Sequence, residues 1–132
     1  MSVAVAEKFT YVLDEPVRIL VVDDDPIQRE FASVYLPTPT AEVMTAVSVE
    51  HGLQRLRSKH FDIVLVDYEM PEANGIDFVR AVRADPRLAD IPIIMVTSHD
   101  DDATIDSAYC AGATAFTTKP VNWRLLSYQI KY

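Results

Sequence analysis

The sequence predicts an α/β domain in which a five-stranded parallel sheet is doubly wound by five helices. Three observations support this prediction. The length of 132 residues suits one domain, and a hydrophobic fraction of 49% is sufficient for a buried core. Short apolar runs alternate with longer segments whose apolar residues recur every three or four positions, which is typical of strands that alternate with helices.

Each expected strand is a short run rich in β-branched and other apolar residues. The third run is almost continuously apolar, which is typical of a strand covered on both faces. The five expected strands are residues 17–22, 41–47, 61–66, 91–96 and 113–117. Residues 1–16 precede them as a leader, so we expect the domain to comprise residues 17–132.

Residues with special conformational preferences mark the ends of the expected helices. Asp25 is suited to cap the first helix and Asn122 the last one, and Gly112 fits the end of the fourth helix. Apolar residues at helical spacing form three faces, which are Ile27, Phe31 and Val34; Ile76, Val79 and Val82; and Leu126 and Ile130.

Composition excludes several classes of protein. The formal net charge is −8, with 20 acidic residues against 12 basic ones, which argues against direct binding of nucleic acid. The single cysteine, Cys110, cannot form an internal disulfide, and we expect it to pack near the core. No segment resembles a signal peptide or a membrane span, so we expect a cytoplasmic protein without a membrane partner.

The last expected helix begins after Asn122 and reaches the end of the chain. No glycine, asparagine or proline closes it there, so its final carbonyl groups have no evident cap. We therefore expect the natural protein to continue beyond Tyr132, with a stand-alone domain as the alternative.

Ion-binding side chains follow the expected strands. Asp23 and Asp24 follow the first, Asp67 the third, Thr97 the fourth and Lys119 the fifth. Ligands of open parallel sheets bind beyond the carboxyl ends of the strands. In the flavodoxin-like strand order 2-1-3-4-5, the first and third strands are neighbours, so the three aspartates would converge.

Three converging carboxylates repel one another unless they take up protons or a cation holds them charged. Mg²⁺ is the natural candidate, because it prefers carboxylates, water and phosphate oxygens. Lys119 would add a fixed positive charge and Thr97 a hydroxyl donor. This combination suits the binding and transfer of a phosphoryl group, for which an aspartate is a known nucleophile.

Four motifs, "ILVVDDDP", "DIVLVDYEMPEANG", "IPIIMVTS" and "GATAFTTKP", occur in this order and spacing. Together they resemble the receiver domain of bacterial response regulators over residues 17–130. The resemblance implies that Asp67 accepts a phosphoryl group from the phosphohistidine of a histidine kinase or a histidine phosphotransfer protein. It also implies an Mg²⁺ site formed by Asp23, Asp24, Asp67 and the main-chain carbonyl of Glu69.

The same resemblance implies roles for residues near the end of the chain. Thr97 and Phe116 would be the switch pair, Lys119 would bind the phosphoryl group, and Lys119–Pro120 would be a cis peptide. Phosphorylation would change the surface of the fourth helix, fifth strand and fifth helix, through which a homodimer could form. The domain would catalyse only its own phosphorylation and dephosphorylation, and would not be an enzyme in the wider sense.

Two alternatives stay open. A degenerate receiver could bind a partner constitutively, and binding that is insensitive to Asp67→Ala would support it. A magnesium-dependent phosphohydrolase could use Glu69 as an acid or base two residues after the nucleophile, and turnover of a phosphate ester would support that alternative.

Overall fold

The computed structural model contains one five-stranded sheet with the order β2-β1-β3-β4-β5, as predicted. All neighbouring strands are parallel. The structure describes residues 17–70 and 74–131, so the expected leader lies outside the described residues. The strands are β1 (Val17–Val22), β2 (Ala41–Ala46), β3 (Ile63–Asp67), β4 (Ile93–Thr97) and β5 (Ala115–Thr118).

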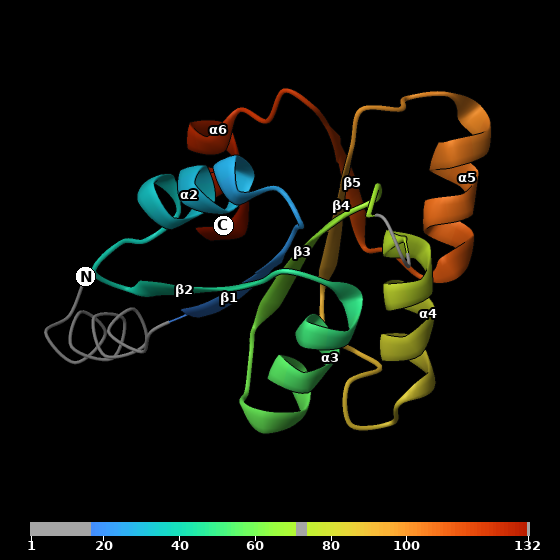
Figure 1. Cartoon of the computed structure of the whole chain (residues 1–132), viewed down its shortest axis with the longest axis horizontal. Helices are drawn as coiled ribbons and strands as arrows, with labels where there is room; N and C mark the ends of the chain where they lie inside the picture. Colours follow the sequence, from blue (N-terminus) through green and yellow to red (C-terminus); the bar gives the residue numbers. More distant parts are fainter. Residues whose placement is uncertain (1–16, 71–73, 132) are drawn as a thin grey trace, which may run out of the picture.

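Five helices cover the two faces of this sheet in the described part of the chain. Figure 1 shows α2 and α6 on one face, and α3, α4 and α5 on the other. The helices are α2 (Pro26–Tyr35), α3 (Val49–Ser58), α4 (Gly75–Ala84), α5 (Asp102–Ala111) and α6 (Trp123–Lys131). The doubly wound α/β arrangement predicted from the sequence is therefore confirmed.

The two faces of the sheet form two separate apolar cores, because successive side chains of a strand point to opposite sides. In β1, Leu20 and Val22 pack on the side of α3 and α4, whereas Ile19 and Val21 pack toward α2 and α6. Phe78 on α4 is the largest of the fully buried side chains in the first core. This two-sided burial explains why the central strands are nearly continuous apolar runs.

The expected caps of the helices are confirmed. The side chain of Asp25 accepts a hydrogen bond from the N–H of Ile27 at 2.9 Å, and that of Asn122 accepts one from Leu125 at 3.0 Å. Gly112 ends α5 with a φ of 110°, a left-handed conformation that favours glycine.

One expectation about side-chain burial is wrong, and one apolar helical face is exposed. An apolar helical face usually faces the sheet, yet Ile27, Phe31 and Val34 of α2 are exposed. α2 instead packs through Ala32, whose small side chain lets the helix approach the sheet closely, and through Leu36 just beyond its end. Cys110 is also exposed, because α5 buries its alanines and turns Cys110 outward.

Candidate functional site

Asp23, Asp24 and Asp67 meet at the carboxyl ends of β1 and β3. The two strands are paired in register, with Val22 opposite Val66, so the residues that follow lie side by side. One carboxylate oxygen from each aspartate lies within 4.8 Å of the others. Asp23 and Asp67 are buried, whereas Asp24 is exposed. The expected convergence of the three carboxylates is therefore present.

Hydrogen bonds to the main chain hold the turn after β1 in place. The N–H of Asp25 donates to Oδ1 of Asp23 at 2.9 Å. Nη1 of Arg29, one turn into α2, donates to the main-chain carbonyl of Asp23 at 2.9 Å. Arg29 was not singled out from the sequence, where it is one basic residue on a helix. Its contact fixes the acidic turn to α2 and brings a positive charge near it.

Lys119 supplies the cation closest to Asp67. Its Nζ lies 2.8 Å from Oδ1 of Asp67. The main-chain N–H of Lys119 donates to the carbonyl of Thr97 at 2.8 Å, which ties the end of β5 to the end of β4. The peptide bond between Lys119 and Pro120 is cis, as the resemblance implied. Lys119 thus follows β5, an edge strand of the sheet, and its side chain reaches the end of β3.

The carboxylates of Asp23 and Asp67 are poorly solvated, and this shifts their pKa values. Burial raises the pKa of Asp23 to about 6, although the Asp25 N–H opposes this change. Burial also raises the pKa of Asp67, against the lowering effect of Lys119. For Lys119, burial alone would lower the pKa, but the hydrogen bond and charge of Asp67 outweigh it and raise the pKa. Buried carboxylates of this kind favour a nearby positive charge, which can be the ammonium group of Lys119 or a bound metal ion.

The residues present fit a divalent cation. Oδ1 of Asp67 is buried, and its contact with Nζ of Lys119 at 2.8 Å shows that the site already favours a positive charge at this carboxylate. Three hard carboxylate donors within 4.8 Å of one another match the ligand preference of Mg²⁺. A cation there would neutralise the like charges and polarise a bound phosphoryl group.

Gly75 brings the N-terminus of α4 against the end of β3. A Cβ atom at this position would lie 2.6 Å from the carbonyl oxygen of Asp67. The N–H of Gly75 donates to the carbonyl of Tyr68 at 3.0 Å. Asn74 and Asp77 form a reciprocal capping box at the start of the helix. The position therefore requires glycine for close approach of the two main chains.

Thr97 and Phe116 lie on the neighbouring strands β4 and β5. Thr97 is fully buried, and its Oγ1 accepts a hydrogen bond from the N–H of His99 at 3.0 Å. Phe116 pairs with Met95 in the sheet and is half-buried. The two residues predicted as a switch pair thus lie on adjacent strands, Thr97 at the end of β4 and Phe116 within the edge strand β5.

The side chain of Glu69 turns away from the cluster toward the loop after β4. Its Oε1 accepts a hydrogen bond from Oγ of Ser98 at 2.6 Å and lies 3.1 Å from Nε2 of His99. The Ser98 hydrogen bond is the main cause that lowers the pKa of Glu69. No sequence pattern predicts this contact, because Ser98 and His99 are ordinary polar residues of a loop.

The doubly wound parallel sheet, with three aspartates and a lysine at the carboxyl ends of its strands, defines an α/β domain of flavodoxin-like topology. The sequence profile of the response regulator receiver domain matches residues 19–131. The chain therefore belongs to the response regulator receiver family of two-component signalling.

Individual relatives agree with this assignment. The chain is 36% identical over 118 residues to the chemotaxis protein CheY of Pseudomonas aeruginosa, covering 86% of this chain and 93% of that protein. It is 33% identical over 112 residues to the heme response regulator HssR of Staphylococcus saprophyticus, covering 85% of this chain and 49% of that protein. The chain therefore spans about half the length of the longer regulator.

A solved structure supports the fold directly. The structure of chemotaxis response regulator CheY4 of Vibrio cholerae superimposes with a TM-score of 0.82 at 29% sequence identity, covering 88% of this chain and 97% of that one. None of the helices in residues 17–70 and 74–131 is long and apolar enough to cross a membrane. Response regulators act with histidine kinases or histidine phosphotransfer proteins.

Proposed function

We propose that this domain is a phosphorylation switch whose acceptor is Asp67 and whose phosphorylation requires Mg²⁺. One observation carries the proposal: Asp67 ends the buried strand β3, lies 2.8 Å from Nζ of Lys119, and shares a 4.8 Å cluster with Asp23 and Asp24. Such a site combines a nucleophile with the charge neutralisation that phosphoryl transfer needs.

In the proposed reaction, a carboxylate oxygen of Asp67 attacks the phosphorus of a phosphohistidine. The new O–P bond forms as the P–N bond breaks, and the electron pair of that bond remains on the imidazole of the donor. Lys119 then holds the negative charge that the phosphoryl group brings. Asp23, Asp24, Asp67 and the main-chain carbonyl of Glu69 are the proposed ligands of Mg²⁺, which would neutralise the phosphoryl oxygens.

The proposed output begins at Thr97. Its hydroxyl accepts the His99 N–H and makes no donated hydrogen bond to the described residues, so its proton is available for a phosphoryl oxygen. Movement of Thr97 toward Asp67 would vacate space for Phe116, the half-buried aromatic on the adjacent strand. The surface of α5, β5 and α6 would change as a result. The added charge would shift the equilibrium between two conformations of the domain.

We propose a histidine kinase or a histidine phosphotransfer protein as the donor, in the cytoplasm. A homodimer through α5, β5 and α6 is the proposed form of self-association, without direct contact with nucleic acid or membrane. Beyond its own phosphorylation and dephosphorylation, the domain is proposed to catalyse no reaction.

The phosphohydrolase alternative is weakened by the placement of Glu69. Its carboxylate is engaged by Ser98 and His99 at 2.6 and 3.1 Å, so it would have to leave both partners to act as an acid or base. The degenerate-receiver alternative is weakened because the acceptor, the acidic pair and the lysine lie together in the described structure.

Intact-mass measurement after incubation with acetyl phosphate and Mg²⁺ tests the proposal. We expect a gain of one phosphoryl group that disappears in Asp67→Asn and on chelation of the metal. Asp106→Asn, an exposed aspartate of α5, is the matched control and should keep the gain. A gain that survives Asp67→Asn would show that the acceptor lies elsewhere.

A further inference from the structure

A cavity of about 460 Å³ opens at the amino-terminal edge of the sheet, where β3 and β4 begin. Its walls are the C-terminal end of α3 with the segment 59–62, and the segment 86–92 between α4 and β4. Asp67 ends β3, so the cavity and the acidic cluster lie at opposite ends of that strand. The cavity therefore has no part in the proposed acceptor site.

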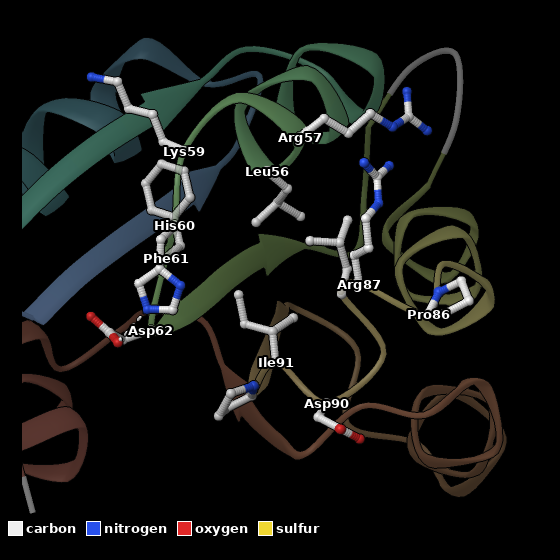
Figure 2. Close-up of a pocket in the computed structure, with 12 residues that line it drawn as sticks. Leu56, Arg57, Lys59, His60, Phe61, Asp62, Pro86, Arg87, Asp90 and Ile91 are labelled. Carbon is white, nitrogen blue, oxygen red and sulfur yellow. Dashed lines mark hydrogen bonds and ion pairs between the residues drawn. The ribbon is translucent and has the colours of Figure 1, made fainter.

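Apolar side chains form one part of the cavity lining. Leu56 and Phe61 are buried members of the core, and Leu88 and Ile91 are half-buried residues that pack against it. Figure 2 shows the side chains of Leu56 and Ile91 directed toward each other across the hollow. An apolar or aromatic group would find a hydrocarbon surface here and be removed from water.

The rim of the cavity is basic, although the whole chain carries a net charge of −8. Its lining contains Arg57, Lys59 and Arg87 against two acidic residues, Asp62 and Asp90. The carboxylate of Asp62 already has two partners. It accepts a hydrogen bond from the main-chain N–H of Arg18 at 2.8 Å and lies 3.0 Å from Nε2 of His60. The lining thus carries three cationic side chains against two acidic ones, and a third carboxylate just outside it, Asp85, pairs with Arg87.

Two of these cations converge. Figure 2 shows the guanidinium groups of Arg57 and Arg87 on the same side of the opening. Arg87 pairs with the carboxylate of Asp85 through Nε at 3.4 Å and Nη2 at 3.3 Å, which holds its guanidinium group in place and leaves Nη1 for a ligand. Paired guanidinium groups match the oxygens of a phosphate or carboxylate.

The wall between α4 and β4 is pre-formed. Nη1 of Arg83 donates to the carbonyls of Ala89 at 3.0 Å and Ile91 at 2.6 Å, and its Nε donates to the carbonyl of Gly112 at 2.9 Å. These bonds hold the segment 86–92 against α4 and the end of α5. A ligand would therefore bind without first ordering this wall, which reduces the entropic cost of binding.

We propose that this cavity binds a small organic anion, in which an apolar or aromatic body fills the space between Leu56 and Ile91 and a phosphate or carboxylate contacts Arg57 and Arg87. The volume lies within the range of small-molecule sites, roughly 300–1,000 Å³. The apolar floor supplies the free energy of binding, and the two guanidinium groups select for negative charge.

The test is an NMR titration of ¹⁵N-labelled protein, without Mg²⁺, using phenyl phosphate, benzoate and benzyl alcohol as probes. We expect the two anions to shift the amide signals of residues 56–62 and 87–91. Benzyl alcohol, which has the same ring but no charge, should bind at least tenfold more weakly. Comparison of phenyl phosphate with benzoate identifies the preferred anionic group.

Two double variants distinguish binding at this cavity from a general effect of the net charge of the protein. Arg57→Gln with Arg87→Gln should weaken binding of the anions at least tenfold. Arg80→Gln with Arg124→Gln removes the same charge from exposed positions outside the cavity and should leave the affinity unchanged. Equal losses in both double variants, equal binding of benzyl alcohol, or shifts centred on Lys119 rather than the cavity would each overturn the proposal.

Discussion

Nζ of Lys119 lies 2.8 Å from Oδ1 of Asp67, although β4 separates the strands that carry the two residues. The lysine comes just after β5 and crosses the carboxyl end of β4 to reach the end of β3. Its main-chain N–H is fixed to the carbonyl of Thr97 on that intervening strand at 2.8 Å. The contact therefore joins three strands, and its loss should affect stability as well as chemistry.

Lys119→Ala should destabilise the metal-free protein by about 1–3 kcal/mol at pH 7.5, because it leaves the buried Asp67 carboxylate without its nearest cation. Urea unfolding measures this change. The loss should shrink in an Asp67→Asn background, where no charge remains to be paired. Lys59→Ala removes an exposed lysine and should have little effect. Equal costs of Lys119→Ala in both backgrounds would contradict a pairwise interaction.

Asp24→Asn should abolish the stabilisation by Mg²⁺ while leaving the metal-free protein as stable as before or more so. The exposed Asp24 contributes repulsion to the cluster when no cation is bound, and a ligand when one is bound. For the unsubstituted protein, Mg²⁺ at ten times its dissociation constant adds about 1.4 kcal/mol. Thermal melts with and without the metal provide the comparison. Asp100→Asn, another exposed aspartate, should retain the full response.

The metal-free protein should lose stability as pH rises from about 5 to 7.5. Burial raises the pKa of Asp23 to about 6 and also raises that of Asp67, so the folded state binds more protons than the unfolded state in this range. Stability from these groups is complete below their unfolded pKa, near 4, and is lost as pH passes the folded values.

Urea midpoints in buffers containing a chelator measure this dependence, and Asp23→Asn should flatten it. Mg²⁺ should reverse the trend, because a cation binds the deprotonated carboxylates and its affinity should fall below pH 6. A stability profile that rises between pH 5 and 7.5 in the metal-free protein, and does not change in Asp23→Asn, would contradict the assignment.

Thr97→Ala should still accept a phosphoryl group on Asp67 but should transmit less of the change to α5, β5 and α6. The variant removes the buried hydroxyl that we assign to the phosphoryl oxygen and leaves the carboxylates intact. Amide chemical shifts of β5 and α6, recorded before and after treatment with acetyl phosphate, give the readout. Thr118→Ala, its exposed neighbour in the sheet, is the control. An unaltered response in Thr97→Ala would indicate another relay.

The fold was largely predictable because the central strands and most helix ends carry local signals. Continuous apolar runs and caps such as Asp25 and Gly112 depend on neighbouring residues only. The burial of α2 was not predictable in this way. Its apolar spacing suggested that Phe31 faces the core, whereas the helix packs through Ala32, since close approach to the sheet favours the smaller side chain.

The candidate site likewise has features that local sequence predicts and features that it does not. The position of Asp67 follows from the end of an apolar strand, and its convergence with Asp23 follows from the strand order. The contacts of Arg29 with the acidic turn and of Glu69 with Ser98 are set by side-chain directions between separate segments. No local pattern encodes such contacts, so the structure was needed to find them.

The contact of Gly75 with the carbonyl of Asp67 also has a genetic consequence. Every amino acid that a single-nucleotide change of a glycine codon can introduce carries a Cβ atom, and here that atom would lie 2.6 Å from the carbonyl oxygen. The first amino-acid replacement at position 75 thus displaces either α4 or the end of β3. Only synonymous changes of this codon leave the contact intact, whereas the exposed face of α2 tolerates replacements of the amino acid itself.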